Sequence, residues 1–162
     1  MQLRSHISPT SHYIPSTFVW AVVALECAGT QRLLYETKAM SGQPSRQGVS
    51  ARKPSLALPS TPVRPDETAA DAAARLMTEL RAPTPPCALA PVAVASTLHG
   101  RSHHVRICFK RDADYDANSS DKSPFVGSPH HVWVSKPSPC EVSLEDLILL
   151  AQLNKADASL GA

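Results

Sequence analysis

Two glutamates and one arginine stand at spacings that suit a metal or phosphate site. Glu67, Arg75 and Glu79 follow one another along a single alanine-rich stretch. On an α-helix, residues four apart are neighbours on the surface, so Arg75 and Glu79 would lie side by side. Carboxylate oxygens are the ligands that Mg²⁺ prefers, and a nearby arginine orients a carboxylate by a salt bridge. These three residues are therefore the candidate site of the chain.

One amphipathic helix is predicted over residues 68–81, so that it carries Arg75 and Glu79 and begins directly after Glu67. Asp66 and Thr68 favour a helix start, and Pro65 and Pro83 bracket the segment. At 100° per residue, one broad apolar face carries Ala69, Ala72, Ala73, Leu76 and Leu80, with Met77 at its edge. We expect this face to pack on a sheet that contains strands at 18–25 and 105–110.

The segment before and through this helix resembles the Nudix box. The family pattern is G-x5-E-x7-R-E-U-x-E-E-x-G-U, where U is an aliphatic residue, and a Leu-Pro-Gly usually precedes it. Leu58-Pro59 matches the Leu-Pro, and Glu67, Arg75 and Glu79 keep the spacing of the box. The match lies in this one motif, while the order of strands and helices is similar to the family over most of 18–155.

Four positions of the box depart from the family pattern. The two glycines fall on Thr61 and Ala82, and two carboxylate positions fall on Leu76 and Leu80. In the family, these carboxylates hold Mg²⁺ against a pyrophosphate substrate. The resemblance therefore implies the fold, a Nudix-like α/β/α sandwich with a mixed β-sheet, one box helix and one C-terminal helix, but not the family's metal site.

Two main functions follow from this resemblance. The first is a non-catalytic Nudix-fold protein without catalytic residues or cofactor, which acts as a structural or RNA- or protein-binding subunit of a larger assembly. A mitochondrial ribonucleoprotein, such as a ribosome or its assembly intermediate, is the expected kind of assembly, and no small-molecule substrate is expected.

The alternative is a divergent Mg²⁺-dependent Nudix hydrolase of nucleoside diphosphate derivatives. In that case Glu79 and Glu67 hold the Mg²⁺, Arg75 orients a glutamate, and Asp112 or another loop acid completes the site. A third possibility is an α/β protein whose likeness to the Nudix box is accidental.

The remaining elements are assigned from apolar periodicity. Strands are predicted at 18–25, 31–38, 89–98, 103–110 and 130–135, of which 103–110 alternates most regularly. A second helix is predicted to begin after Ser143 as its N-cap, with Asp146 at the third helical position. Its expected apolar face carries Leu144, Leu147, Ile148 and Ala151.

One domain over 18–155 accounts for most of the chain. Residues 41–53 and 111–128 are polar and predict exposed loop insertions, and 156–162 is expected to be a tail. Residues 1–17 are expected to be a flexible terminus or a short mitochondrial presequence, because the first acidic residue is Glu26. No apolar run approaches the length of about 20 residues that a membrane-spanning helix needs.

The distribution of charge bears on possible partners, and the cysteine content bears on the cellular compartment. The net charge is +2, but residues 1–65 carry seven basic and two acidic side chains, and the remainder carries nine and twelve. A basic front half favours an anionic neighbour such as RNA, although surface solubility explains it equally well. The four cysteines form no C-x-x-C pair, which favours buried thiols in a reducing compartment such as the cytoplasm or the mitochondrial interior.

Overall fold

The computed structural model describes residues 16–27, 30–38, 55–82, 89–113 and 130–160. The predicted loop at 41–53 lies outside these residues, as do 1–15 of the N-terminal segment and 114–128 of the second predicted loop. The loop prediction at 111–113 is wrong, because these residues continue a strand that ends at Ala113.

Within the described residues, seven strands form one mixed sheet. They are β1 (Ser16–Cys27), β2 (Arg32–Lys38), β3 (Ser55–Ala57), β4 (Ser60–Pro62), β5 (Ala93–His99), β6 (Ser102–Ala113) and β7 (His131–Val134). The main order is β3-β2-β1-β6-β5, with β4 also paired to β1 and β7 to β2. Strands β1 and β6 run parallel and in register over their whole length, while the other pairs are antiparallel.

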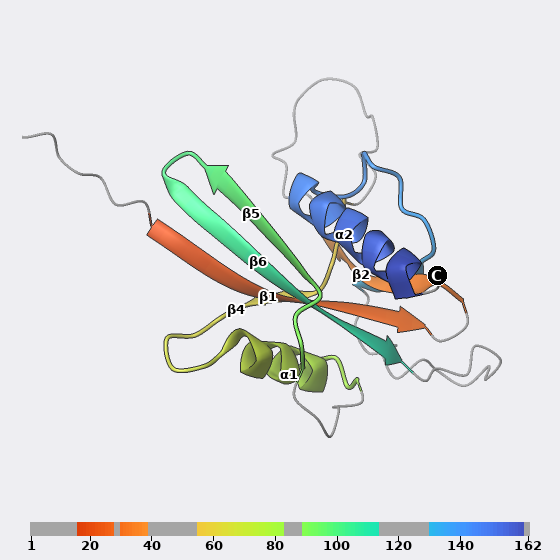
Figure 1. Cartoon of the computed structure of the whole chain (residues 1–162), viewed down its shortest axis with the longest axis horizontal. Coiled ribbons are helices and arrows are strands. Elements are labelled where there is room, and N and C mark those ends of the chain that lie inside the picture. The colour runs from red at the N-terminus through yellow and green to blue at the C-terminus, as the bar shows by residue number, and fades with distance from the viewer. Residues whose placement is uncertain (1–15, 28–29, 39–54, 83–88, 114–129, 161–162) are drawn as a thin grey trace, which may run out of the picture.

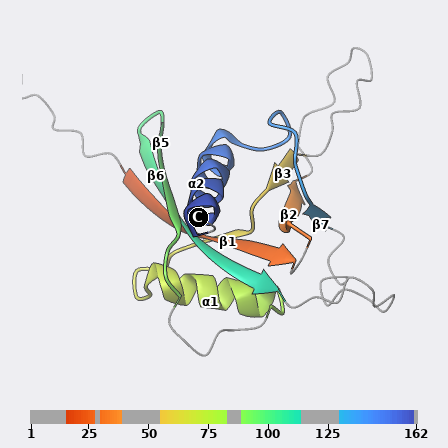
Figure 2. The ribbon, with the colours of Figure 1, turned by 45° about the vertical axis from the view of Figure 1, so that its right-hand side comes forward.

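Two helices cover opposite faces of this sheet. Helix α1 (Ala69–Glu79) lies on one face and α2 (Leu144–Leu160) on the other (Figures 1 and 2). The layers are therefore helix, sheet and helix, as the sequence predicts. Among the described residues, no helix combines the length and the apolar character needed to cross a lipid bilayer.

Helix α1 begins where the sequence places its start. Thr68 is the N-cap, its hydroxyl accepts the Asp71 N–H at 3.1 Å, and Asp71 in turn accepts the Thr68 N–H at 3.1 Å. This reciprocal capping box satisfies two backbone donors that a helix start leaves unpaired. The chain leaves the helix through Arg81, whose φ of 54° is left-handed.

The apolar face of α1 packs on the sheet, as predicted. Its buried residues join side chains of β1, β2 and β6 in one cluster: Ala21, Val23, Leu25, Leu34, Ala72, Ala73, Leu76, Met77, Leu80, Ala82 and Phe109. A second cluster, which includes Val22, Tyr35, Cys108 and Leu149, lies between the sheet and α2. The position of the box helix is therefore fixed by its leucines and alanines.

The predicted apolar face of α2 is correct only in part, because Leu147 and Ile148 pack against the second cluster but the other two predicted residues are exposed. Ser143 does cap the helix, because its hydroxyl accepts the Asp146 N–H at 3.3 Å. However, Leu144 is 67 % exposed and Ala151 is exposed, whereas Leu149 and Leu153 are buried. Asp146 is also fully buried, so the helix is rotated relative to the prediction. It continues through Leu160, which places most of the expected tail in the helix.

Strand β5 forms an edge of the sheet, and α2 closes part of this edge. The Gln152 side chain donates to the Val94 carbonyl at 2.8 Å and accepts the Val94 N–H at 3.0 Å. Both backbone groups of Val94 therefore point away from β6. Because outward and inward groups alternate along an antiparallel strand, those of Ser96 and Leu98 point the same way.

Candidate functional site

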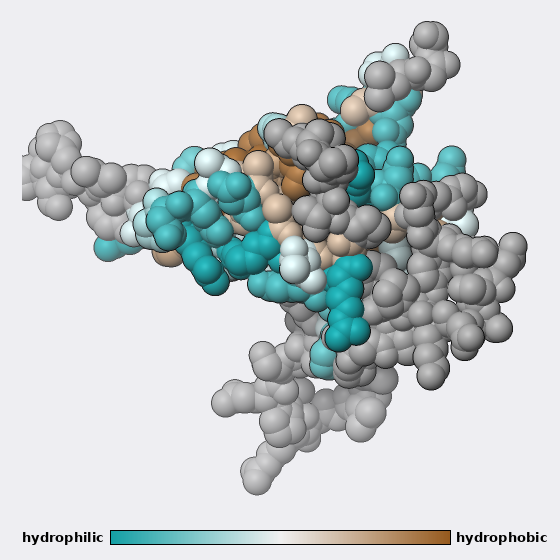
Figure 3. Space-filling view, turned by 90° about the horizontal axis from the view of Figure 1, so that it is seen from below, coloured by the Kyte–Doolittle hydropathy of each residue, from teal (hydrophilic) through white to brown (hydrophobic). Residues whose placement is uncertain are grey.

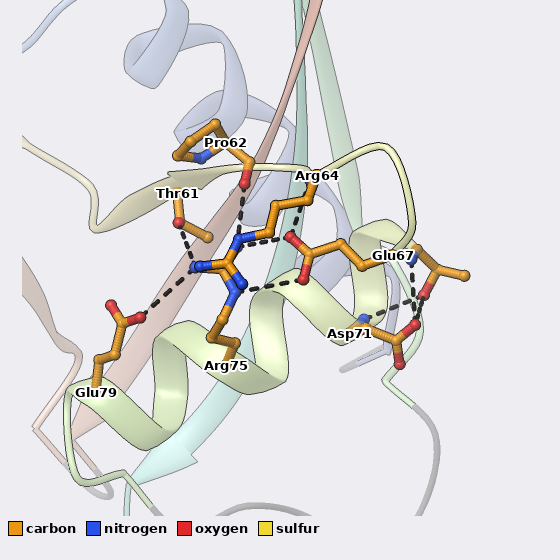
Figure 4. Close-up of polar contacts among 8 residues, drawn as sticks. Thr61, Pro62, Arg64, Glu67, Asp71, Arg75 and Glu79 are labelled. Atoms are coloured by element: carbon orange, nitrogen blue, oxygen red, sulfur yellow. Dashed lines mark hydrogen bonds and ion pairs between the residues drawn. The ribbon is translucent and has the colours of Figure 1, made fainter.

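Arg75 is the centre of the polar network on α1 (Figure 4). Its guanidinium contacts both Glu67 oxygens, at 2.6 and 3.3 Å, and donates to the Thr61 hydroxyl at 3.0 Å and the Pro62 carbonyl at 3.1 Å. Glu79, one turn further along the helix, lies 3.5 Å from the same guanidinium. The structure thus brings together all three predicted site residues, Glu67, Arg75 and Glu79.

The carboxylate of Glu67 is already occupied by these contacts. Hydrogen bonds from Arg75, and from the Arg64 N–H at 2.9 Å, hold its pKa below the usual value. The same pairing raises the pKa of Arg75. Both groups remain charged, and their bidentate geometry fastens the loop before α1 to the helix.

Leu76 and Leu80 occupy the two box positions where the family places carboxylates. They are 5 % and 8 % exposed and belong to the core cluster between α1 and the sheet. Their side chains fill apolar space, so no oxygen ligand is available at either position.

The carboxylates that remain do not fit a Mg²⁺ site for a pyrophosphate. Glu67 is engaged by Arg75 and Arg64, and Glu79 is more than half exposed. Asp112 is a residue of β6 in register with Glu26, on the face where Lys110 meets Asp157 of α2, opposite to α1. It therefore does not complete the site, contrary to the hydrolase alternative. In the described part of the chain, no three His, Cys, Asp or Glu side chains are grouped for a metal ion.

A separate cavity of about 430 Å³ lies between the sheet and the start of α2. Its lining includes Trp20, Ser55, Ser60, His104, Arg106, Cys140, Glu141, Ser143, Glu145 and Asp146. Arg106 forms a salt bridge with one Asp146 oxygen at 2.7 Å, and the second Asp146 oxygen accepts the Leu58 N–H at 3.2 Å. Asp146 thus joins α2, β6 and the Leu-Pro segment of the box, all from a buried position.

Aromatic and acidic side chains stand near the mouth of this cavity. His104 packs against Phe18 and His99, with ring centroids 5.3 and 5.2 Å apart. His99 also contacts Glu145. Burial opposes ionisation of Glu145, but hydrogen bonds from its own N–H and from His99 outweigh this, and its pKa is lowered.

The sequence alone does not indicate this cavity. Trp20 lies in a continuous apolar run, and Asp146 has the spacing of an ordinary helix cap. Only the three-dimensional pairing with Arg106 distinguishes Asp146 from a solvent-exposed capping residue.

Known proteins resemble this chain in fold and not in sequence. Neither a protein-family model nor a curated protein sequence matches this chain. A mutT/nudix family protein from Listeria innocua superposes with a TM-score of 0.61 at 17 % identity, over 88 % of this chain and 94 % of that one. The C-terminal domain of mouse MUTYH, in a complex with human PCNA, superposes with a TM-score of 0.60 at 14 % identity, over 87 % of this chain and 90 % of that one.

A third solved structure carries a ligand. The NUDIX domain of Shewanella oneidensis NrtR, complexed with ADP ribose, gives a TM-score of 0.54 at 16 % identity, over 93 % of this chain and 94 % of that one. The likeness in all three cases extends over nearly the whole length of both chains. The sandwich of a mixed sheet between the box helix and α2 is therefore a Nudix fold.

Proposed function

We propose that this chain is a non-catalytic Nudix-fold protein that serves as a structural or RNA- or protein-binding subunit of a larger assembly. The observation that carries the proposal is the burial of Leu76 and Leu80 at two positions where the family uses carboxylates. Metal-assisted attack on a pyrophosphate needs those charges to hold the ion and to position water. Removing one well-placed electrostatic group commonly costs about 2.7–4 kcal/mol of transition-state stabilisation.

The Arg75 network supports the same proposal. Arg75 binds Glu67 through two hydrogen bonds and also reaches Thr61 and Pro62, so it fastens the box loop onto α1. The residues of the box that this chain retains thus have a structural role. The C-terminal domain of mouse MUTYH, which superposes on this chain, was solved in a complex with human PCNA and is an example of a similar fold in a protein complex.

A mitochondrial ribonucleoprotein, such as a ribosome or its assembly intermediate, remains the proposed setting. It rests on the acid-free residues 1–17 and on the basic excess of residues 1–65. Cell fractionation of the full chain with a C-terminal tag tests it, and recovery only from the cytosol would contradict it.

A divergent hydrolase of nucleoside diphosphate derivatives is the second candidate. It is favoured by the open cavity beside Trp20 and Arg106, and by the binding of ADP ribose to the NUDIX domain of NrtR. In that case Glu79, with Glu67, would have to hold Mg²⁺ while both remain beside Arg75.

A substrate screen separates the two candidates. The full chain is incubated with nucleoside diphosphate derivatives, ADP-ribose included, in the presence of Mg²⁺ or Mn²⁺, and product is measured by chromatography. We expect no turnover above the level of a Glu79→Gln variant. Turnover within seconds that disappears in Glu79→Gln would overturn the non-catalytic proposal and establish the hydrolase.

A further inference from the structure

A cavity of about 570 Å³ lies between the sheet and α2, further along the helix than the cavity beside Trp20. Its apolar wall is formed by four leucines, Leu33 of β2 and Leu147, Leu150 and Leu153 of α2. It shares no lining residue with the cavity beside Trp20, and the retained residues of the box do not line it. We call it the leucine cavity. Its volume falls in the range of about 300–1,000 Å³ that is usual for small-molecule sites.

The hollow shape of this wall distinguishes its leucines from other apolar side chains at the surface. Seen from below, hydrophobic side chains gather in a band beside hydrophilic ones (Figure 3). Apolar atoms contribute more than half of an ordinary protein surface, so exposure of that kind needs no ligand. In the leucine cavity, by contrast, Leu33, Leu147 and Leu150 are half-buried and Leu153 is buried. A concave apolar wall favours a ligand with an apolar body.

The charged groups around the leucine cavity satisfy one another. The lining contains two carboxylates, those of Glu26 and Asp157, and two lysines, Lys110 and Lys136. The Lys110 ammonium lies 2.7 Å from an oxygen of each carboxylate, and Lys136 is exposed to solvent. A charged ligand would therefore lose its hydration without gaining a buried counter-charge in return. The cavity thus favours an uncharged ligand.

One buried polar group of the wall lacks a partner. Tyr35 of β2 lines the leucine cavity and is 0 % exposed, and its hydroxyl has no hydrogen-bond partner among the described residues. Burial, together with the charge of Asp146, raises the pKa of Tyr35, so the hydroxyl keeps its proton and is a donor. A buried donor without an acceptor destabilises the folded chain. A ligand that brings an oxygen acceptor to Tyr35 would remove this penalty.

We propose that the leucine cavity binds an uncharged small molecule with an apolar body and a carbonyl oxygen that accepts a hydrogen bond from Tyr35. The hydroxyl is closed to water in the free chain. The half-buried Leu147 and Leu150 pack against the same cluster as Tyr35, and they rotate aside when the ligand enters. Apolar contact with the leucines supplies most of the affinity, and the tyrosine selects the acceptor. This site goes beyond the structural role proposed above and does not depend on it.

The test is an NMR titration of the isotope-labelled full chain with acetophenone, which carries an apolar ring and one carbonyl. Ethylbenzene has nearly the same shape without the oxygen, and benzoate and benzylamine carry a negative and a positive charge in place of the acetyl group. We expect acetophenone to bind at millimolar concentration and to shift the signals of Leu150 and Asn154, which line the cavity. Ethylbenzene should bind about three- to tenfold more weakly, the contribution of one neutral hydrogen bond. Each charged probe should bind at least tenfold more weakly than acetophenone.

Three variants locate the site. Tyr35→Phe removes only the hydroxyl, so it should bind acetophenone and ethylbenzene equally well. Ala151→Phe fills the cavity from an exposed position of its lining and should weaken acetophenone binding at least tenfold. The same substitution at Ala158, which is exposed on α2 and outside the lining, should leave binding unchanged.

Several outcomes would overturn the inference. These are no acetophenone binding by a chain whose spectrum shows it folded, equal binding of acetophenone and ethylbenzene to the wild type, and an unchanged preference in Tyr35→Phe. Unchanged binding by Ala151→Phe would place the probe elsewhere on the chain, and tighter binding of benzoate or benzylamine would show a site for a charged ligand instead. Hydrolase activity in the substrate screen would refute the proposed function without changing any of these binding results.

Discussion

Replacing Leu76 by glutamate restores a carboxylate of the Nudix box and tests whether that position faces a metal or the core. Leu76 is 5 % exposed inside the α1 cluster. Removing a buried leucine side chain costs about 1.5–3 kcal/mol. Keeping the new carboxyl neutral at pH 7 costs about 3.7 kcal/mol, because its usual pKa of about 4.3 lies well below that pH and each unit corresponds to about 1.36 kcal/mol.

The expected loss from Leu76→Glu is therefore roughly 5–7 kcal/mol at pH 7, close to the entire stability of a marginal domain. The loss depends on pH with a definite sign. Burial gives the introduced carboxyl a higher pKa in the folded than in the unfolded protein. The variant is therefore least destabilised below about pH 4, and the deficit grows as the pH rises toward the folded-state pKa.

Urea unfolding followed by circular dichroism measures this deficit at several pH values, with and without millimolar Mg²⁺. The matched control is Thr78→Glu, on the exposed side of the same helix, which should stay within about 0.5 kcal/mol of the wild type. A Leu76→Glu protein as stable as the wild type would refute the reasoning. Recovery of its stability on addition of Mg²⁺, absent in the control, would show that the position faces a metal site.

Three further predictions concern the rest of the fold. Asp146→Ala should lose about 3–5 kcal/mol in urea unfolding by leaving Arg106 unpaired, whereas the double variant Asp146→Leu with Arg106→Met should recover most of that loss. Burial raises the pKa of Cys108 to about 12, so peptide-resolved alkylation at pH 8 should label Cys140 in the folded protein and Cys108 only after unfolding. Thr68→Ala should cost about 1 kcal/mol in thermal unfolding, and an unchanged melting temperature would contradict the capping role.

The sequence predicts α1 well because its signals are local. Thr68 and Asp71 cap each other across three residues, and the alanines and leucines share a single face. Strand β6 is predicted for the same reason, since Val105, Ile107 and Phe109 alternate with the residues between them. Its true end at Ala113 is not predictable locally, because the charged residues 111–112 remain in the strand through their pairing with β1.

The orientation of α2 shows where local signals fail. Leu147, Ile148, Leu149 and Leu150 follow one another, so the pattern alone offers apolar residues in every direction. Long-range contacts choose among them: Asp146 with Arg106, Gln152 with Val94, and Asp157 with Lys110. A buried aspartate cannot be distinguished from an exposed one by periodicity, and the cavity beside Trp20 was missed for that reason.

The bond between Gln152 and Val94 has a consequence for how the chain folds. Strand β5 precedes α2 by about fifty residues, so the edge of the sheet stays uncovered until the helix docks. Uncovered edge strands are sites at which chains pair with one another and aggregate. In the folded protein one glutamine amide occupies both edge groups of Val94. By covering this edge, helix α2 therefore prevents β5 from pairing with other copies of the chain. A chain that ends before residue 152 should be prone to aggregation even when its strands have formed.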